Sequence, residues 1–187
     1  MLMKSRRALV LSALLLSAAP LPAMAQEASS WRTVPAERLL VVETSKGRVL
    51  VELFPDVAPA HVERVTTLAD QGFYDGHTFH RVIEGFMAQT GDPTGTGRGG
   101  SDYDDLPAEF SNVPFERGTV GMARSQSPNS GNSQFFIMFA PGSFLNGQYT
   151  VWGQVIDGMD KVDAITRGEP PRNPDKMVDV YIAADKK

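Results

Sequence analysis

Short segments that are either mostly apolar or alternate between apolar and polar residues recur along most of the chain. Both patterns predict β-strands. Two runs over 39–44 and 48–54 are rich in β-branched residues and are joined by Ser45-Lys46-Gly47. We expect a β-hairpin there, because Gly47 can adopt the positive φ that a tight turn often needs. Further strands are predicted over residues 78–83, 86–90, 118–123, 134–139, 150–156 and 177–184.

Helical spacing is found in two segments. The first begins near Pro59, which suits a first helical turn because its missing N–H would have no partner there in any case. Val62, Val65 and Leu68 follow at intervals of three residues and would face a core. A second helix is predicted over 159–166.

This balance of elements favours an all-β fold. Many short strands, loops rich in glycine and proline, and only two helices are typical of a barrel or sandwich. They do not fit a parallel α/β sheet, whose strands alternate with helices. No internal repeat is found.

The first 25 residues differ from the rest and predict a cleavable signal peptide. Lys4, Arg6 and Arg7 precede an apolar stretch over 8–19, and a small-x-small cleavage site follows at 23–25. The alternative, a membrane anchor, would need roughly 20 apolar residues. The paired arginines partly match a twin-arginine signal, so the export route stays open. We expect an exported protein, periplasmic if the source has an outer membrane.

Composition predicts one globular domain over 39–187, preceded by an arm over 26–38. The chain of 187 residues is 42% hydrophobic and 21% charged. Without the three basic residues of the signal, 15 basic residues face 22 acidic ones, a formal charge of −7. This charge argues against a nucleic-acid partner. There is no cysteine, which excludes disulfides and thiolate metal sites.

Two segments concentrate side chains that can hold a proline ring and act on its amide bond. The first is Phe79-His80-Arg81-Val82-Ile83-Glu84-Gly85-Phe86-Met87-Ala88-Gln89-Thr90-Gly91-Asp92, and the second is Ser133-Gln134-Phe135-Phe136-Ile137-Met138. Together they resemble the signature of cyclophilin-type peptidyl-prolyl cis-trans isomerases, and the resemblance extends over residues 39–182.

The resemblance implies a closed antiparallel barrel of about eight strands, capped by two α-helices, with the active groove on its outside. It implies an enzyme that needs no cofactor and no metal. The expected partners are proline-containing segments of unfolded or partly folded exported proteins, and the expected state is a monomer.

The chemistry of the reaction points to Arg81. Rotating an amide bond costs about 18 to 20 kcal/mol, and the isomers of an Xaa-Pro bond differ little in energy. A catalyst therefore has only to bind the twisted amide better than the planar one. The prolyl nitrogen regains a lone pair in the twisted state, and a fixed guanidinium can donate to it. Arginine stays protonated and offers several donors in one plane.

Other roles follow from the resemblance, position by position. Gln89 would hydrogen-bond the substrate backbone, and His80 would support the site as a neighbour of Arg81. Gln134 would position Arg81 or the substrate from behind. The apolar pocket for the proline ring would be formed by Phe86, Met87, Phe136 and Leu145. The remaining substrate-binding positions would be Ala123, Arg124, Phe144 and Tyr149.

Three positions depart from the family pattern. Arg124 falls where asparagine is common in the family. This substitution keeps the pairing of the backbone with the bound peptide but not a role of the asparagine side chain. Phe144 replaces a tryptophan that in many members hydrogen-bonds the inhibitor cyclosporin, and phenylalanine has no N–H to offer. We therefore predict weak cyclosporin binding. Tyr149 replaces a pocket histidine but keeps an aromatic face, so catalysis should persist.

Single residues and short motifs also have other interpretations. Taken singly, the apolar pocket residues could be core, Arg81 a surface ion pair and His80 a core histidine; their joint occurrence favours a site. Residues 95–100 fit G-x-G-x-x-G but do not precede a predicted helix. The histidines and aspartates near 75–92 are poorly spaced for a metal, and no G-x-S-x-G is present. A peptide-holding chaperone without catalysis, or a scaffold subunit, remains an alternative.

Overall fold

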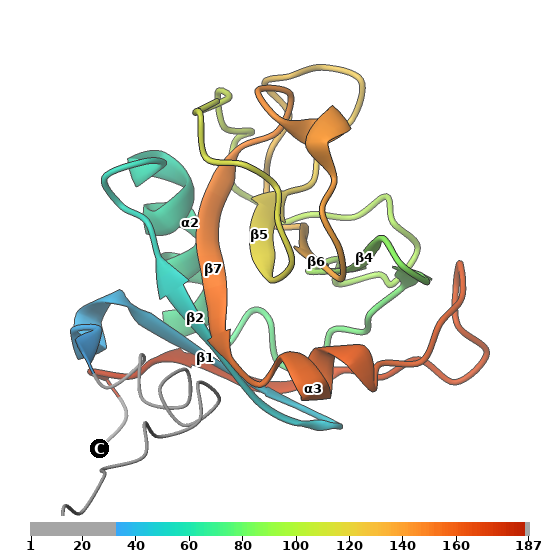
Figure 1. Cartoon of the computed structure of the whole chain (residues 1–187). Helices are drawn as coiled ribbons and strands as arrows, with labels where there is room; N and C mark the ends of the chain where they lie inside the picture. The colour runs from blue at the N-terminus through green and yellow to red at the C-terminus, as the bar shows by residue number, and fades with distance from the viewer. Residues whose placement is uncertain (1–32, 186–187) are drawn as a thin grey trace, which may run out of the picture.

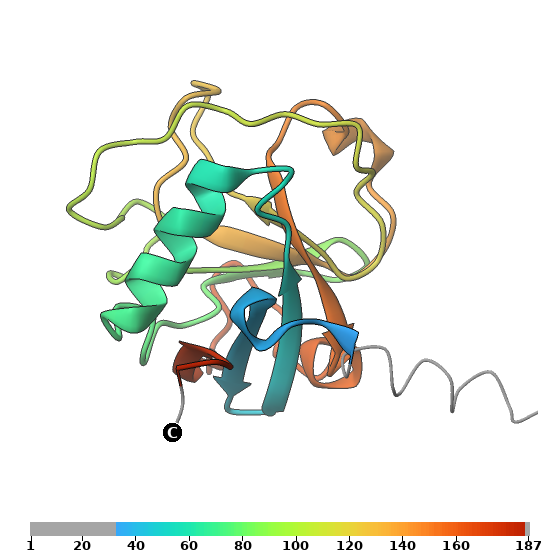
Figure 2. The same cartoon turned by 90° about the vertical axis from the view of Figure 1, so that its left-hand side faces the viewer.

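The computed structural model describes residues 33–185, and the predicted signal peptide lies outside that range. Within it, eight strands form one antiparallel sheet in the order β3-β4-β6-β5-β7-β2-β1-β8 (Figures 1 and 2). The strands are β1 (Leu39–Thr44), β2 (Gly47–Leu53), β3 (Arg81–Ile83), β4 (Met87–Thr90), β5 (Thr119–Met122), β6 (Phe135–Met138), β7 (Val151–Asp157) and β8 (Met177–Ile182). The all-β prediction is confirmed.

The first two strands form the predicted hairpin. Thr44 pairs with Gly47 across a two-residue turn, and Gly47 has a φ of +125°. The hydroxyl of Thr44 donates to the carbonyl of Gly47 at 2.7 Å, which fastens the turn. β1 is buried on both faces, since Leu40 and Val42 enter the main core while Leu39 and Val41 pack with Leu50 in a small second cluster.

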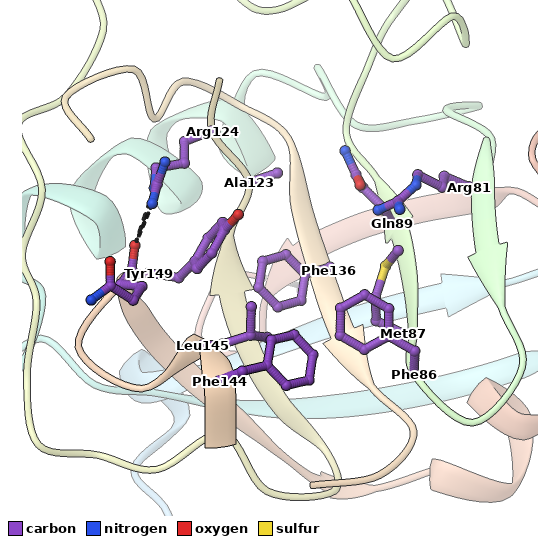
Figure 3. A pocket seen from close by; sticks show the side chains of 11 residues that line it. Arg81, Phe86, Met87, Gln89, Ala123, Arg124, Phe136, Phe144, Leu145 and Tyr149 are labelled. Atoms are coloured by element: carbon purple, nitrogen blue, oxygen red, sulfur yellow. Dashed lines mark hydrogen bonds between the residues drawn. The ribbon is translucent and has the colours of Figure 1, made fainter. Parts of the chain in front are cut away.

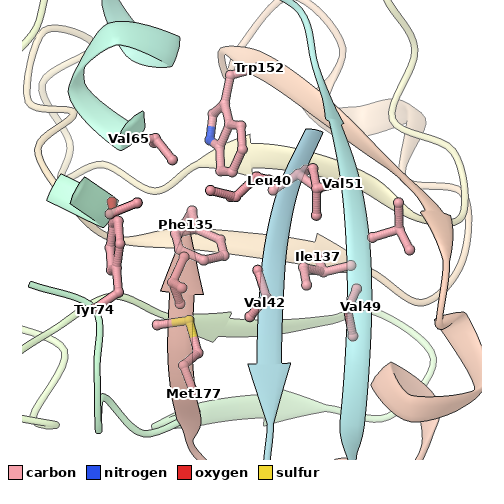
Figure 4. Close-up of a cluster of buried hydrophobic side chains, with 14 of the residues drawn as sticks. Leu40, Val42, Val49, Val51, Val65, Tyr74, Phe135, Ile137, Trp152 and Met177 are labelled. Carbon is pink, nitrogen blue, oxygen red and sulfur yellow. The ribbon is translucent and has the colours of Figure 1, made fainter. Parts of the chain in front are cut away.

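The main core lies on the inner face of the sheet (Figure 4). Three large rings meet edge to face there. The ring centroids of Tyr74 and Phe135 are 5.6 Å apart, and those of Phe135 and Trp152 are 5.3 Å apart. Helix α2 (Pro59–Asp70) covers this core with the predicted residues, of which Val65 and Leu68 are completely buried. Burial of these side chains stabilises the fold at roughly 1.5 to 3 kcal/mol each.

Strict alternation along β6 divides the apolar residues between two cores. Phe135 and Ile137 point into the main core, while Phe136 and Met138 point to the opposite face. Successive side chains of a strand must point to opposite faces, so a continuously apolar strand needs a cover on both. On the second face the cover is a smaller cluster that also contains Met87 of β4.

The prediction of a closed barrel is wrong. Among residues 33–185 no ladder joins the two edge strands β3 and β8, so the sheet is an open half-barrel. The segment between α3 (Met159–Asp163) and β8 carries three prolines, which have no N–H to donate to a ladder. At the other edge, the strand predicted over 78–83 is shortened to β3. Isolated backbone bridges span the gap: Thr78 with Lys176 and Val82 with Gly168.

The other differences concern element ends and short helical turns. The predicted helix over 159–166 ends at Asp163, and a single 3₁₀ turn, η3 (Ser143–Leu145), was not predicted. A second 3₁₀ turn, η2 (Ala36–Arg38), lies in the predicted arm. In the part of the chain that the structure describes, no helix has the length and apolar character needed to cross a bilayer.

Candidate active site

A groove opens on the second face of the sheet, over β4, β5 and β6 (Figure 3). Its cavity has a volume of about 470 Å³. The loop that contains η3 closes one side, and β3 with β4 forms the other. The residues that line it are Arg81, Phe86, Met87, Gln89, Ala123, Arg124, Phe136, Phe144, Leu145, Gln148 and Tyr149.

The floor of the groove is apolar and rigidly packed. Phe136, Met87 and Leu145 are each less than a tenth exposed. Phe136 stacks on Phe115 with centroids 5.7 Å apart, and Tyr149 meets it edge-on at 5.8 Å. An apolar, closely packed floor of this kind suits a small apolar ring, because the ring gains burial without losing hydrogen bonds.

An aromatic pair, of which Phe86 is half-buried and Phe144 is exposed, forms the rim beside this floor. Phe86 and Phe144 lie with their ring centroids 5.5 Å apart, and Phe144 is 68% exposed. The 3₁₀ turn explains the contrast between neighbours, since Leu145 faces the floor while Phe144 faces outward. The rim therefore offers apolar surface to any chain that crosses the groove.

The polar groups gather at the opposite end of the groove. Arg81 of β3 and Gln89 of β4 are direct cross-strand partners, which brings their side chains to one face (Figure 3). The amide nitrogen of Gln89 donates to Gln134 Oε1 at 2.9 Å, and the amide nitrogen of Gln134 donates to the carbonyl of Gly99 at 2.8 Å. This chain of hydrogen bonds orients the Gln89 amide from behind.

Arg81 is held at one of its three guanidinium nitrogens. Nε donates to Glu169 Oε2 at 2.8 Å, and the side chains are 41% and 52% exposed. Within residues 33–185 the two terminal nitrogens have no hydrogen-bond partner in the protein. Two donors therefore remain for a ligand at the edge of an apolar floor.

His80 lies outside the groove. His80 is buried and lines an adjoining cavity of about 430 Å³, which shares Arg81 and Gln89 with the groove. Burial lowers the pKa of its imidazole, which favours the neutral ring at pH 7. His80, predicted as a catalytic residue, is therefore a neighbour of Arg81 that does not line the groove.

Gln134 also lies outside the groove, in an adjoining polar cavity of about 570 Å³. The two cavities share Gln89, Ala123 and Arg124 as a common border. Gln134 reaches the groove only through its hydrogen bond to Gln89. Its predicted place behind the site agrees with this arrangement, although its direct partner is Gln89 and not Arg81.

The side chain of Arg124 has a structural role. Its Nε and Nη2 donate to the carbonyl of Gln148, and Nη1 donates to the carbonyl of Ser125 at 2.9 Å. Its guanidinium lies 4.4 Å from the centroid of the Tyr149 ring. The side chain thereby ties together the two loops that border the groove and holds the Tyr149 ring.

A buried carboxylate organises the loop behind Arg81. Asp92 accepts hydrogen bonds from the backbone of Thr94, Thr96 and Gly97 at 2.6 to 3.0 Å. Burial opposes ionisation of Asp92, but hydrogen bonds from Thr94, Gly99 and Gly97 outweigh it and lower its pKa to about 2. The loop over 94–99 lines both side cavities, so Asp92 supports the polar end of the site.

Sequence reasoning missed three residues around the groove. Gln148 lines it, Phe115 supports Phe136 from beneath, and Glu169 holds Arg81. None lies in either signature segment, and each reaches the site from a loop. Of the three, only Phe115 gave a signal in the sequence, its aromatic side chain, and that signal fits a core residue as well as a site residue.

Comparison with other proteins agrees with this geometry. The family model described as cyclophilin type peptidyl-prolyl cis-trans isomerase matches residues 39–184. A protein of Brucella suis named probable peptidyl-prolyl cis-trans isomerase is 53% identical over 167 residues, covering 81% of this chain and 85% of its own. A peptidyl-prolyl cis-trans isomerase of Synechococcus elongatus is 42% identical, covering 78% of this chain and 96% of its own.

Solved structures show the same fold. A cyclophilin of Hirschia baltica superposes with a TM-score of 0.77 at 32% identity, covering 82% of this chain and 77% of its own. A cyclophilin type isomerase of Cryptosporidium parvum, solved in the presence of the dipeptide Ala-Pro, gives a TM-score of 0.73 at 32% identity, covering 77% and 98%. The chain therefore belongs to the cyclophilin-type peptidyl-prolyl cis-trans isomerase family and is an enzyme of that class.

Proposed function

We propose that this isomerase stabilises the twisted Xaa-Pro amide through Arg81 while the apolar floor of the groove holds the proline ring. The observation that carries the proposal is the pairing of two guanidinium donors, which have no partner within residues 33–185, with a buried apolar floor in one cavity of about 470 Å³. A planar amide has no lone pair on its nitrogen to accept a hydrogen bond, whereas the twisted amide does. The donor therefore favours the transition state over both ground states.

The roles of the other groups follow from where they lie. Gln89, oriented by Gln134, offers its amide to the substrate backbone beside Arg81. Phe136 and Leu145 bury the ring, and Tyr149 limits its movement from the side. No bond is broken and no proton is moved, so the chemistry needs only this fixed arrangement of donors and apolar surface.

We propose further that the substrates are proline-containing segments of exported proteins during their folding. The predicted signal peptide supports this compartment, and Xaa-Pro isomerisation takes tens to hundreds of seconds without a catalyst, which makes it a slow folding step. The protein would act as a monomer, in the periplasm if the source has an outer membrane, without a nucleic-acid partner.

The test is cis-trans exchange in a short Xaa-Pro peptide, followed by NMR with catalytic amounts of the protein. This measurement reads the exchange directly and needs no coupled protease. The parent should accelerate exchange, and Arg81→Ala should lower kcat about 10²-fold or more while peptide affinity changes little. Equal losses of affinity and turnover in Arg81→Ala would contradict the mechanism.

The same experiment separates catalysis from simple peptide holding. A holder would bind the peptide, as seen by chemical-shift changes at Phe136 and Tyr149, without accelerating exchange. The compartment is tested by expressing the full sequence and sequencing the N-terminus of the exported product. Export with a new N-terminus after Ala25 is expected, and retention of the complete leader inside the cell would refute it.

A further inference from the structure

The guanidinium of Arg81 is anchored from a distant part of the chain. Glu169 accepts from its Nε at 2.8 Å, although the two residues are 88 positions apart. Because Nε lies at the base of the planar guanidinium, a bond at this atom sets how the plane is turned. The two terminal nitrogens then point where the plane points, and in Figure 3 the guanidinium lies beside Gln89 at the edge of the groove.

Backbone pairing brings Glu169 to this place. Gly168 and Val82 exchange two hydrogen bonds, of 2.8 and 2.9 Å, at the free edge of β3. In an antiparallel bridge the residues on either side also face each other, so Glu169 lies opposite Arg81. Position 168 requires glycine, because a Cβ there would lie 2.6 Å from the Cα of Pro171.

The segment that carries Glu169 is fastened independently of it. Arg167 donates from Nε to Glu84 at 2.6 Å and lies 4.2 Å over the ring of Phe139. Its Nη1 also donates to the carbonyl of Asp163, the last residue of α3, and to the carbonyl of Ile165. Together with the Gly168 bridge, these contacts hold the segment against β3. The carboxylate of Glu169 is therefore not needed to dock it.

We propose that Glu169 is a positioning residue, which holds the Arg81 guanidinium in the orientation that donates to the twisted amide. The inference rests on the proposed role of Arg81. A long side chain that is 41% exposed can adopt several rotamers, and only one or a few aim its donors at the prolyl nitrogen. Exposed ion pairs contribute little, so losing this one should slow turnover about threefold and at most about fivefold.

The experiment compares three variants of the full protein in the peptide exchange assay. Glu169→Ala should lower kcat about threefold with KM unchanged, because orientation matters only in the transition state. Glu169→Gln keeps an oxygen that can accept from Nε and should recover most of the rate. Glu84→Ala is the matched control, since it removes the neighbouring ion pair of the same segment, that of Arg167, and should leave kcat unchanged.

An NMR measurement reads the ion pair itself. The Nε–H signal of Arg81 should exchange with water faster in Glu169→Ala than in the parent, and should be unaffected in Glu84→Ala. A kcat unchanged in Glu169→Ala would overturn the proposal. So would an equal loss in Glu84→Ala, because the effect would then come from loosening of the segment.

The Arg81→Ala background separates this proposal from the one on which it rests. If Glu169 acts through Arg81, adding Glu169→Ala to Arg81→Ala changes nothing further, and a further loss of rate overturns the inference. If Arg81→Ala alone keeps full activity, the proposed mechanism fails. If Arg81→Ala is inactive and Glu169→Ala is fully active, only the positioning role fails.

Discussion

The two faces of the central strands are equally apolar, yet one is core and the other is a site. On the inner face, α2 and the curved sheet enclose Trp152 and Phe135 completely. On the outer face, Met87 and Phe136 are also buried, but the loops leave Phe86 half-buried and Phe144 68% exposed. The same alternation of side chains therefore produces a sealed core where a helix covers the sheet and a binding groove where only loops do.

The polar groups sharpen this contrast. The main core contains few polar side chains, whereas the groove ends at Arg81 and Gln89. Substitutions on the inner face should then change stability and leave catalysis intact, whereas substitutions on the outer face should change peptide binding or catalysis.

Trp152→Ala should destabilise the protein by about 3 to 5 kcal/mol, because it leaves a large cavity in a closed core. Chemical denaturation measures the loss, and the exchange rate per folded molecule should not change. If this variant does not fold, Trp152→Phe serves instead. It should cost less, since it also removes an indole N–H that has no hydrogen-bond partner within residues 33–185. A loss below about 1 kcal/mol in Trp152→Ala would contradict the enclosed core.

Phe136→Ala should weaken binding of a proline peptide about tenfold or more, because the floor loses the apolar surface worth roughly 1.5 to 3 kcal/mol. Titration of the peptide by NMR measures the affinity. Phe110→Ala is the control, since Phe110 is exposed but does not line the groove. Unchanged affinity in Phe136→Ala would show that the apolar floor does not bind the proline ring.

Asp92 should make the free energy of unfolding depend on pH in the acid range. Its pKa is lowered from 3.8 in the unfolded chain to about 2 in the fold, so its contribution is fully present above pH 4 and is lost as the pH falls toward 2. The difference corresponds to about 2 kcal/mol. Asp92→Asn should flatten the dependence of the free energy of unfolding on pH between 4 and 2. An identical slope in parent and variant would contradict this.

Phe144→Trp should strengthen cyclosporin binding about fivefold, because one neutral hydrogen bond contributes about 1 kcal/mol. Phe144 lies on the open rim, so the new indole N–H would be accessible without disturbing the core. Titration calorimetry measures both proteins. A nanomolar complex with the parent would refute the prediction of weak binding, and equal affinities would show that the rim donor is unimportant.

The elements that sequence reasoning found are those with strong local signals. The hairpin over 39–53 and the core-facing residues of α2 lie where their periodicity placed them, because each depends on side chains close together in the chain. The family resemblance likewise predicted ten of the eleven residues that line the groove. His80 and Gln134 were also predicted for the site, but they line the adjoining cavities.

The all-β class, the two helices and most of the residues that line the groove were predictable from the sequence. These properties depend on local periodicity and on the family resemblance. Three features emerge only when the chain folds: the sheet stays open, Phe115 supports the floor and Glu169 reaches Arg81. Those features join residues tens of positions apart, and no local pattern encodes which loop returns to which strand edge.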